Sequence, residues 1–172
     1  MAQLRTIILD GDPILREQAI EVRRFSSALH KLLDDMKFTM YHENGVGLAA
    51  PQIGVSKQLV VIDDREGGFV ELVNPQIIEA KGCEEGVEFC LSVPGRGGRV
   101  LRAAQIKVKA QDRFGKPFTL NVSGQRARVF QHEIDHLQGK LFTDVMTEEF
   151  FGESGEEPED RGKRGTGAKE RD

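Results

Sequence analysis

The chain has 172 residues, of which 38% are hydrophobic, and a formal net charge of −4; this length suits one domain with its own core. The acidic balance, without a basic patch that alternates with aromatic residues, argues against a nucleic-acid-binding surface. The N-terminus lacks the apolar run of a signal peptide, no segment is long enough to span a membrane, and only two cysteines are present. We therefore expect a cytoplasmic protein without membrane contact, in which Cys83 is a free thiol.

The first predicted element is an amphipathic helix from Ser27 to Tyr41. Its apolar positions recur at spacings of three and four, the period of one buried helical face: Phe25, Leu29, Leu32, Met36 and Met40. The pair Asn44-Gly45 supplies a C-terminal stop. Apolar and alternating runs then predict four strands, at residues 58–63, 70–73, 106–110 and 117–122.

A second helix is predicted after Ser123, a candidate N-cap, and it is expected to stop at Gly139. Its apolar residues again follow the helical period: Ala127, Phe130, Ile134, Leu137 and Leu141. The order of elements indicates an α+β fold, with helices at both ends of a strand-rich middle that packs on this central helix. The Phe130 side would face the sheet, which leaves a cleft between the helix and the segment around Cys90.

The second helix carries the sequence His132-Glu133-Ile134-Asp135-His136. On a helix this spacing places two imidazoles one turn apart with a carboxylate beside them, which supplies two metal ligands and a base. A catalytic site of this kind usually has three protein ligands and one open position. The longer pattern with a third histidine fails, because position 142 is Phe142. Cys90, in an apolar stretch of extended character, is the better candidate for the third ligand.

Three motifs follow one another along the chain: GVGLAAPQ at residues 45–52, EFCLS at residues 88–92 and QHEIDH at residues 131–136. In this order they resemble the motifs of peptide deformylases, the bacterial and organellar metallohydrolases that remove the formyl group from the N-terminal methionine of new polypeptides. The resemblance extends from about Arg5 to about Asp144. It implies a single catalytic domain, for which we expect the bounds 1–151.

The resemblance assigns the metal ligands to Cys90, His132 and His136 and the general base to Glu133. One thiolate and two imidazoles accept Fe(II), Zn, Ni or Co, so the ligand types alone do not identify the ion. The resemblance implies one Fe(II) ion in the cell. It also implies an N-formylmethionyl peptide as substrate, formate as product, and a transient association with the ribosome.

Other residues take their expected roles from the same resemblance. The side-chain amide of Gln52 and the backbone N–H of Leu91 would stabilise the charge that develops on the formyl oxygen. An ion pair between Glu88 and Arg102 would support the Cys90 segment. Substrate contacts are expected from four residues: Gly45, Val46, Gly47 and Phe89.

Three other functions are compatible with parts of the sequence. Residues 45–50 also fit the dinucleotide pattern G-x-G-x-x-A, but that fingerprint needs a strand before it and a helix after it. A helix is predicted before these glycines, and Pro51 falls where the following helix would need a backbone N–H. A metallopeptidase could use the same glutamate and histidines. A metal-stabilised binding module would have a closed site with a fourth protein ligand.

Phe89 departs from the second motif, which usually has glycine at this position. Side chains alternate along an extended segment, so if Cys90 points at the metal, Phe89 points to the opposite face. We predict an ordinary extended conformation at Phe89 and retained activity. Arg96 and Arg99, in a glycine-rich stretch with the character of a loop, are candidates to meet the backbone or carboxylate of a peptide.

Residues 152–172 form a charged tail with five glycines and one alanine as its only apolar residue. Such a composition buries too little apolar surface to offset the entropy of ordering, so we predict a disordered segment. Deleting these residues should leave both the melting temperature and the activity nearly unchanged. A large loss of either would show that the tail docks on the domain.

Overall fold

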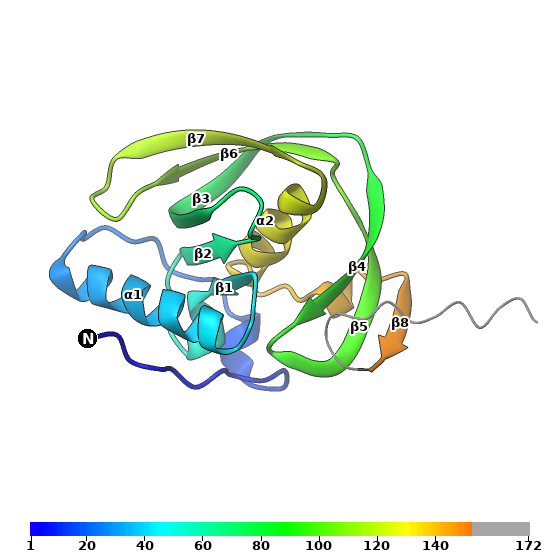
Figure 1. Cartoon of the computed structure of the whole chain (residues 1–172), viewed down its shortest axis with the longest axis horizontal. Coiled ribbons are helices and arrows are strands. Elements are labelled where there is room, and N and C mark those ends of the chain that lie inside the picture. The colour runs from blue at the N-terminus through cyan, green and yellow to red at the C-terminus, as the bar shows by residue number, and fades with distance from the viewer. Residues whose placement is uncertain (153–172) are drawn as a thin grey trace, which may run out of the picture.

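The computed structural model describes residues 1–152, which form an α+β fold with two antiparallel sheets around a central helix (Figure 1). The predicted α+β class is confirmed. The helices are α1 (Ser27–His42) and α2 (Gly124–His136), with short 3₁₀ helices η1 (Pro13–Arg16), η2 (Ala50–Ile53) and η3 (Phe142–Asp144). The strands are β1 (Gly47–Ala49), β2 (Leu59–Asp63), β3 (Phe69–Lys81), β4 (Glu84–Cys90), β5 (Val93–Arg102), β6 (Gln105–Gln111), β7 (Pro117–Ser123) and β8 (Glu148–Phe151).

Helix α1 matches its prediction closely. Ser26 caps its N-terminus by accepting a hydrogen bond from the backbone N–H of Leu29 at 3.4 Å. Beyond the helix, Asn44 adopts a left-handed conformation with φ of 56°, which ends the helix as the sequence predicted. The apolar face of α1 packs on β1 and β2 and encloses Leu33, Met36 and Met40 completely.

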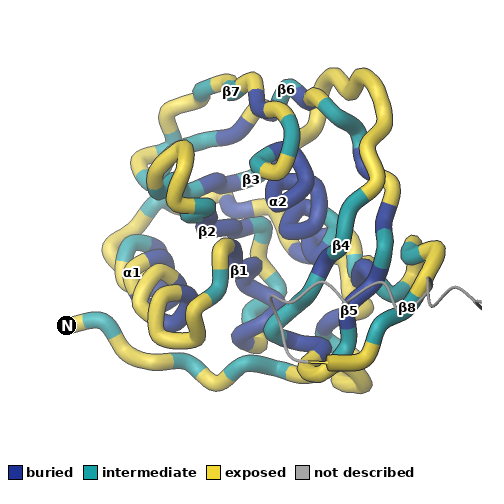
Figure 2. The backbone as a smooth tube through the Cα atoms, turned by 45° about the vertical axis from the view of Figure 1, so that its right-hand side comes forward, coloured by how far each residue is buried: buried dark blue, intermediate teal, exposed yellow. Residues whose placement is uncertain are grey.

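The larger sheet has the strand order β1-β2-β3-β6-β7 and contains all four predicted strands. Helix α2 packs on this sheet and is buried along most of its length (Figure 2). Phe130 and Ile134 lie in one core cluster with Val60, Ile62 and Leu72 of the sheet. The expectation that the Phe130 side faces the sheet is therefore confirmed.

The smaller sheet has the order β4-β5-β8 and was not predicted as a sheet. Its strands are rich in glycine and charged residues, which lower intrinsic strand propensity. Because β8 follows α2, the expected order with helices at both ends of the strands is wrong. The interpretation of the Arg96–Arg99 stretch as a loop is also wrong, since both residues lie in β5. Their side chains form ion pairs with residues of β8, Arg96 with Glu149 and Arg99 with Glu148.

The C-terminal end of α2 is shorter than its apolar period suggested. The helix ends at His136, and Gly139 follows with φ of 72° in the turn beyond it. Gly139 therefore ends the helical turn as expected, but Leu141 is not part of the helix. Leu141 instead packs with Val93 and Val100 in a separate core cluster beneath β5.

The predicted tail falls almost entirely on residues 153–172, which lie outside the described part of the chain. Its disorder and its dispensability stay predictions. No helix within residues 1–152 is long and apolar enough to cross a membrane.

Candidate metal centre

Cys90, His132 and His136 meet at the junction of the two sheets. Cys90 is the last residue of β4, and the two histidines lie one turn apart on α2. Their ligand atoms all lie within 4.8 Å of one another, and Cys90 Sγ is 3.4 Å from His136 Nε2. The imidazoles are nearly inaccessible, with exposed fractions of 7% for His132 and 1% for His136. The structure thus brings together the three predicted ligands, and a thiolate with two imidazoles suits a divalent transition metal.

Glu88 fixes which nitrogen of His132 can face a metal. Its Oε1 lies 2.7 Å from His132 Nδ1. Burial raises the pKa of Glu88, but hydrogen bonds from Arg102 and His132 outweigh this effect and hold the pKa well below its usual range. An ionised carboxylate only accepts hydrogen bonds, so Nδ1 carries the proton and Nε2 keeps a lone pair for the ion.

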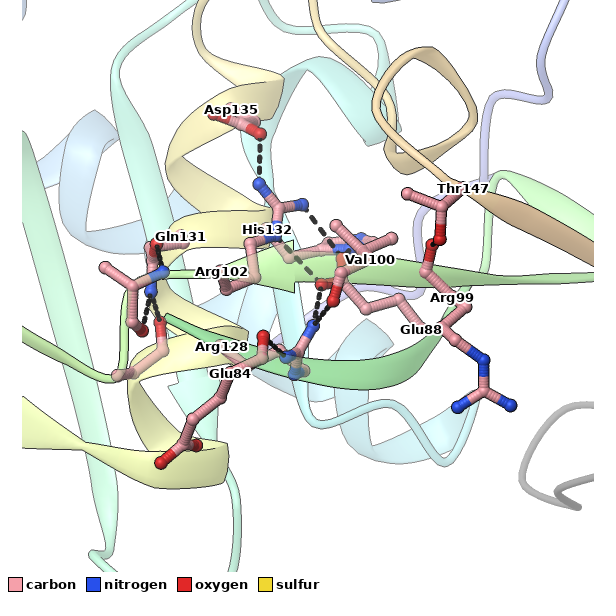
Figure 3. Close-up of polar contacts among 12 residues, drawn as sticks. Glu84, Glu88, Arg99, Val100, Arg102, Arg128, Gln131, His132, Asp135 and Thr147 are labelled. Atoms are coloured by element: carbon pink, nitrogen blue, oxygen red, sulfur yellow. Dashed lines mark hydrogen bonds and ion pairs between the residues drawn. The ribbon is translucent and has the colours of Figure 1, made fainter. Parts of the chain in front are cut away.

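Two arginines hold Glu88 (Figure 3). The predicted pair with Arg102 is confirmed: Arg102 Nε and Nη2 each donate to a different oxygen of Glu88 at 2.9 Å. Arg102 Nη1 also reaches Asp135 of α2 at 2.6 Å. Arg128, which the sequence analysis did not single out, donates to Glu88 Oε2 at 2.8 Å. Its position four residues before His132, hence on the same helical face, was the available signal.

Glu133 lies in the wall of the same site with an exposed fraction of 5%. Within the described residues its Oε2 has no hydrogen-bond partner, which leaves an oxygen free for a water molecule. Burial raises the pKa of Glu133 to about 7. A carboxylate with this raised affinity for protons is suited to take a proton from water near neutral pH.

Gln52 is held rigidly beside Cys90. Its Oε1 accepts a hydrogen bond from the backbone N–H of Ala49 at 3.0 Å, and its Nε2 donates to Ser92 Oγ at 3.1 Å. The same Nε2 lies 3.5 Å from Cys90 Sγ. Leu91 follows Cys90 in the turn between β4 and β5. The two predicted donors therefore flank the candidate metal ligand, and Ser92 is a further contact that sequence reasoning did not find.

A cleft of about 510 Å³ opens beside these residues. Its two sides are α2 and the β4 segment that carries Cys90, as predicted. Every predicted substrate-contact residue lines it, together with the two donors, the base, two of the three metal ligands and the supporting residue Glu88: Gly45, Val46, Gly47, Gln52, Glu88, Phe89, Cys90, Leu91, His132 and Glu133. A cleft of this size can hold a few residues of a peptide.

Gly47 has a steric role that its motif did not reveal. A Cβ at this position would lie 2.7 Å from Glu133 Cγ and 2.8 Å from its Oε1. We expect Gly47→Ala to displace the Glu133 carboxylate and to lower kcat by about 100-fold with the metal retained. Gly45→Ala is the matched control, because its Cβ would meet the flexible end of Leu91 at 3.0 Å, and its loss should be much smaller. Equal activity of the two variants would contradict the steric explanation.

Phe89 adopts the predicted conformation. It lies in β4 opposite Gly97, directly before a register shift between Phe89 and Cys90, and it is not among the non-glycine residues of positive φ within the described chain. Its ring lies over Gly97, where a Cβ would collide with it. The ring therefore fills the space that the missing side chain leaves on β5.

This packing supports the prediction that Phe89 does not abolish activity. Wild-type protein and Phe89→Gly should release formate from a formylated peptide at similar rates. The variant should melt at a lower temperature, because Gly97 loses its cover. An assay in which only Phe89→Gly is active would show that the phenyl group obstructs the cleft.

Comparison with known proteins agrees with the three motifs. A family model described as polypeptide deformylase matches residues 4–150. The chain is 52% identical to the peptide deformylase of Caldicellulosiruptor bescii over 162 residues, which cover 94% of this chain and 95% of the relative. It is also 52% identical to the peptide deformylase of Carboxydothermus hydrogenoformans over 134 residues, 78% of this chain and 88% of the relative.

Solved structures show the same fold. The peptide deformylase of Legionella pneumophila superposes with a TM-score of 0.82 at 48% identity, over 84% of this chain and 87% of that one. The enzyme of Synechococcus elongatus, solved in complex with actinonin, gives a TM-score of 0.81 at 40% identity, over 86% of this chain and 82% of that one. With the matching family model, these similarities establish that the chain belongs to the polypeptide deformylase family.

Proposed function

We propose that this protein is a metal-dependent peptide deformylase that hydrolyses the N-terminal formyl group of N-formylmethionyl peptides and releases formate. One observation carries the proposal: the donors of Cys90, His132 and His136 lie together, and two of them share a cleft with the buried carboxylate of Glu133. Among residues 1–152 the donor cluster has three members, which leaves one position of a tetrahedral site for water or substrate. A metal-stabilised binding module would use a fourth protein ligand there.

The residues of the cleft supply the remaining chemistry. When bound by the three donors, a divalent ion would act as a Lewis acid toward water and the formyl oxygen. Glu133 takes a proton from a water molecule while the oxygen of that water attacks the formyl carbon. It then delivers the proton to the amine nitrogen as the C–N bond breaks. The Gln52 amide and the Leu91 backbone N–H donate hydrogen bonds to the oxygen on which negative charge develops.

The identity of the ion and the cellular setting belong to the same proposal. We propose Fe(II) in the cell, although the donor set also accepts Zn, Ni or Co. We place the reaction in the cytoplasm, where reducing conditions keep Cys90 available as a thiolate, and in transient contact with the ribosome that supplies the substrate. The substrate backbone would lie between the Gly45–Gly47 segment and β4. The Synechococcus elongatus relative was solved in complex with actinonin, which supports the proposal that a protein of this fold holds a ligand.

Formate release tests the proposal. The metal-loaded protein is given a formyl-Met tripeptide and, in parallel, the same tripeptide with a free N-terminus and a longer internal peptide. We expect formate and the free tripeptide from the first substrate and no cleavage of the others. Cleavage of internal peptide bonds would indicate a metallopeptidase. Absence of any reaction with a fully loaded site would indicate a binding module.

A further inference from the structure

Arg128 is a buried cation at the side of the cleft. It lies on α2 one turn before His132, and its side chain has an exposed fraction of 5%. Arginine is seldom buried to this extent without partners that satisfy its charge and its five N–H donors. All the hydrogen-bond partners that the described residues supply lie on the neighbouring strands β4 and β5.

Three directed contacts join Arg128 to these strands (Figure 3). Nη1 donates to Glu88 Oε2 and to the carbonyl of Val100, and Nη2 donates to the carbonyl of Glu84, each at 2.8 Å. One side chain of α2 thus contacts the start of β4, the part of β4 close to Cys90, and the neighbouring strand β5. Gly86 of β4 makes room for it, because a Cβ there would lie 2.7 Å from Arg128 Nε.

The metal ligands come from two parts of the fold that have separate cores. His132 and His136 belong to α2, whose apolar side packs on the five-stranded sheet. Cys90 belongs to β4 and packs against a different cluster, formed by Val93, Val100, Leu141 and Phe142. The distance between the thiolate and the imidazoles therefore depends on the contacts that tie α2 to the β4–β5 hairpin.

Arg102 also joins α2 to this hairpin, but it cannot balance the charges of the cluster alone. Its guanidinium is shared between two carboxylates, Glu88 at 2.9 Å and Asp135 at 2.6 Å. Arg128 supplies the second cation of this four-charge cluster. The cluster also orients His132 through Glu88 Oε1, whereas His136 Nδ1 has no partner within residues 1–152. Within residues 1–152, Glu88 is thus the only protein group that forms a hydrogen bond with the Nδ1 atom of either histidine.

We propose that Arg128 is a positioning residue of the metal centre. It holds Glu88 and the β4–β5 hairpin at a fixed place relative to α2, so that Cys90 and the two histidines meet around one ion. This inference rests on the proposed metal-dependent function. It predicts an effect of geometry and not of charge alone, because a positive charge at position 128 would by itself weaken the binding of a cation.

Two substitutions separate geometry from charge. Arg128→Met keeps most of the side-chain length and removes the guanidinium. Arg128→Lys keeps the charge, but an ammonium on a flexible stem cannot reproduce the three directed contacts. Each protein is loaded with Co(II), and the release of the ion to a chelator is followed together with the charge-transfer absorption of the thiolate–Co(II) bond. We expect release about 10–100-fold faster in both variants and a weakened or shifted absorption band.

Two further variants complete the test. Arg126→Met is the matched control: Arg126 lies on the same helix, pairs with Asp64 at 2.9 Å and does not contact Glu88, so its release rate should equal that of the wild type. Gly86→Ala should displace the Arg128 guanidinium without changing the sequence at position 128. It should accelerate release in the same direction, which keeps the proposal testable if Arg128→Met does not fold.

Wild-type release rates in Arg128→Lys and Gly86→Ala would overturn the proposal, because the directed contacts of the guanidinium would then be dispensable. Slower release in Arg128→Met would also overturn it, since removing a positive charge near a cation strengthens binding by charge alone. An equal acceleration in Arg126→Met would also overturn it, because general loosening of α2 would suffice. Metal release is measured without substrate. A failure of the proposed deformylase activity would instead appear as absent formate release in the loaded wild-type protein.

Discussion

Glu133→Gln should lower kcat for a formylated tripeptide by about 10²–10⁴-fold, the usual contribution of a general acid–base group. The amide keeps the shape of the side chain but cannot accept the proton of water. Its neighbours His132 and His136 are unchanged, so the metal content should stay that of the wild type. Steady-state kinetics combined with elemental analysis of the same sample gives both numbers.

Glu17→Gln, a change of an exposed carboxylate on the N-terminal segment, is the control for this experiment and should have no effect. Normal turnover by Glu133→Gln would remove Glu133 from proton transfer. A loss of metal together with activity would leave the role of Glu133 in the chemistry without support, because the variant would then fail for lack of the ion.

Cys90→Ser should lose the metal. A serine hydroxyl is not ionised near neutral pH, so the change removes the soft anionic ligand from a site otherwise made of two imidazoles. Changes in groups that merely support a ligand already cost about 10–100-fold in metal affinity, and loss of a ligand should cost more. Elemental analysis after dialysis against a weak chelator should show little bound metal.

The chain provides its own matched control, since Cys83 is the second free cysteine and is exposed. Cys83→Ser should retain metal and activity. Full occupancy with wild-type affinity in Cys90→Ser would exclude Cys90 from the coordination of the ion. The predicted set would then reduce to His132 and His136.

The elements with a strong period could be predicted from the sequence. Helix α1 and the strands of the larger sheet have apolar residues at regular spacings, and the structure places them within one or two residues of expectation, except that β3 runs on to Lys81. The second half of β3 is exposed, and its two isoleucines, Ile77 and Ile78, are adjacent in the sequence, so the alternation that marks a strand is missing there. The β4-β5-β8 sheet was missed because glycines and charged residues there are compatible with strands only through pairing with neighbours.

The candidate site was predicted better than the fold around it. The ligand types, their spacing and the ordered motifs pointed to Cys90, His132, His136 and Glu133, and the structure brings these residues together; the chemistry restricts those residue types. What the sequence could not show is which polar groups are buried together. In the sequence Arg128 is indistinguishable from an exposed helical arginine, and only the structure shows that it lies against Gly86 of β4. Likewise Gly47 reads as a loop glycine until Glu133 is seen against it.

Dependence of deformylation on one metal ion is tested by a titration of the metal-free protein with Fe(II) under anaerobic conditions, with formate release from a formyl-Met tripeptide measured at each step. A single three-ligand centre predicts that activity rises in proportion to added iron and reaches a plateau at one ion per chain. In Glu133→Gln the same amount of iron should bind without restoring turnover. Formate release by the metal-free protein, or activity that does not follow occupancy of the site, would contradict a metal-dependent reaction at this centre.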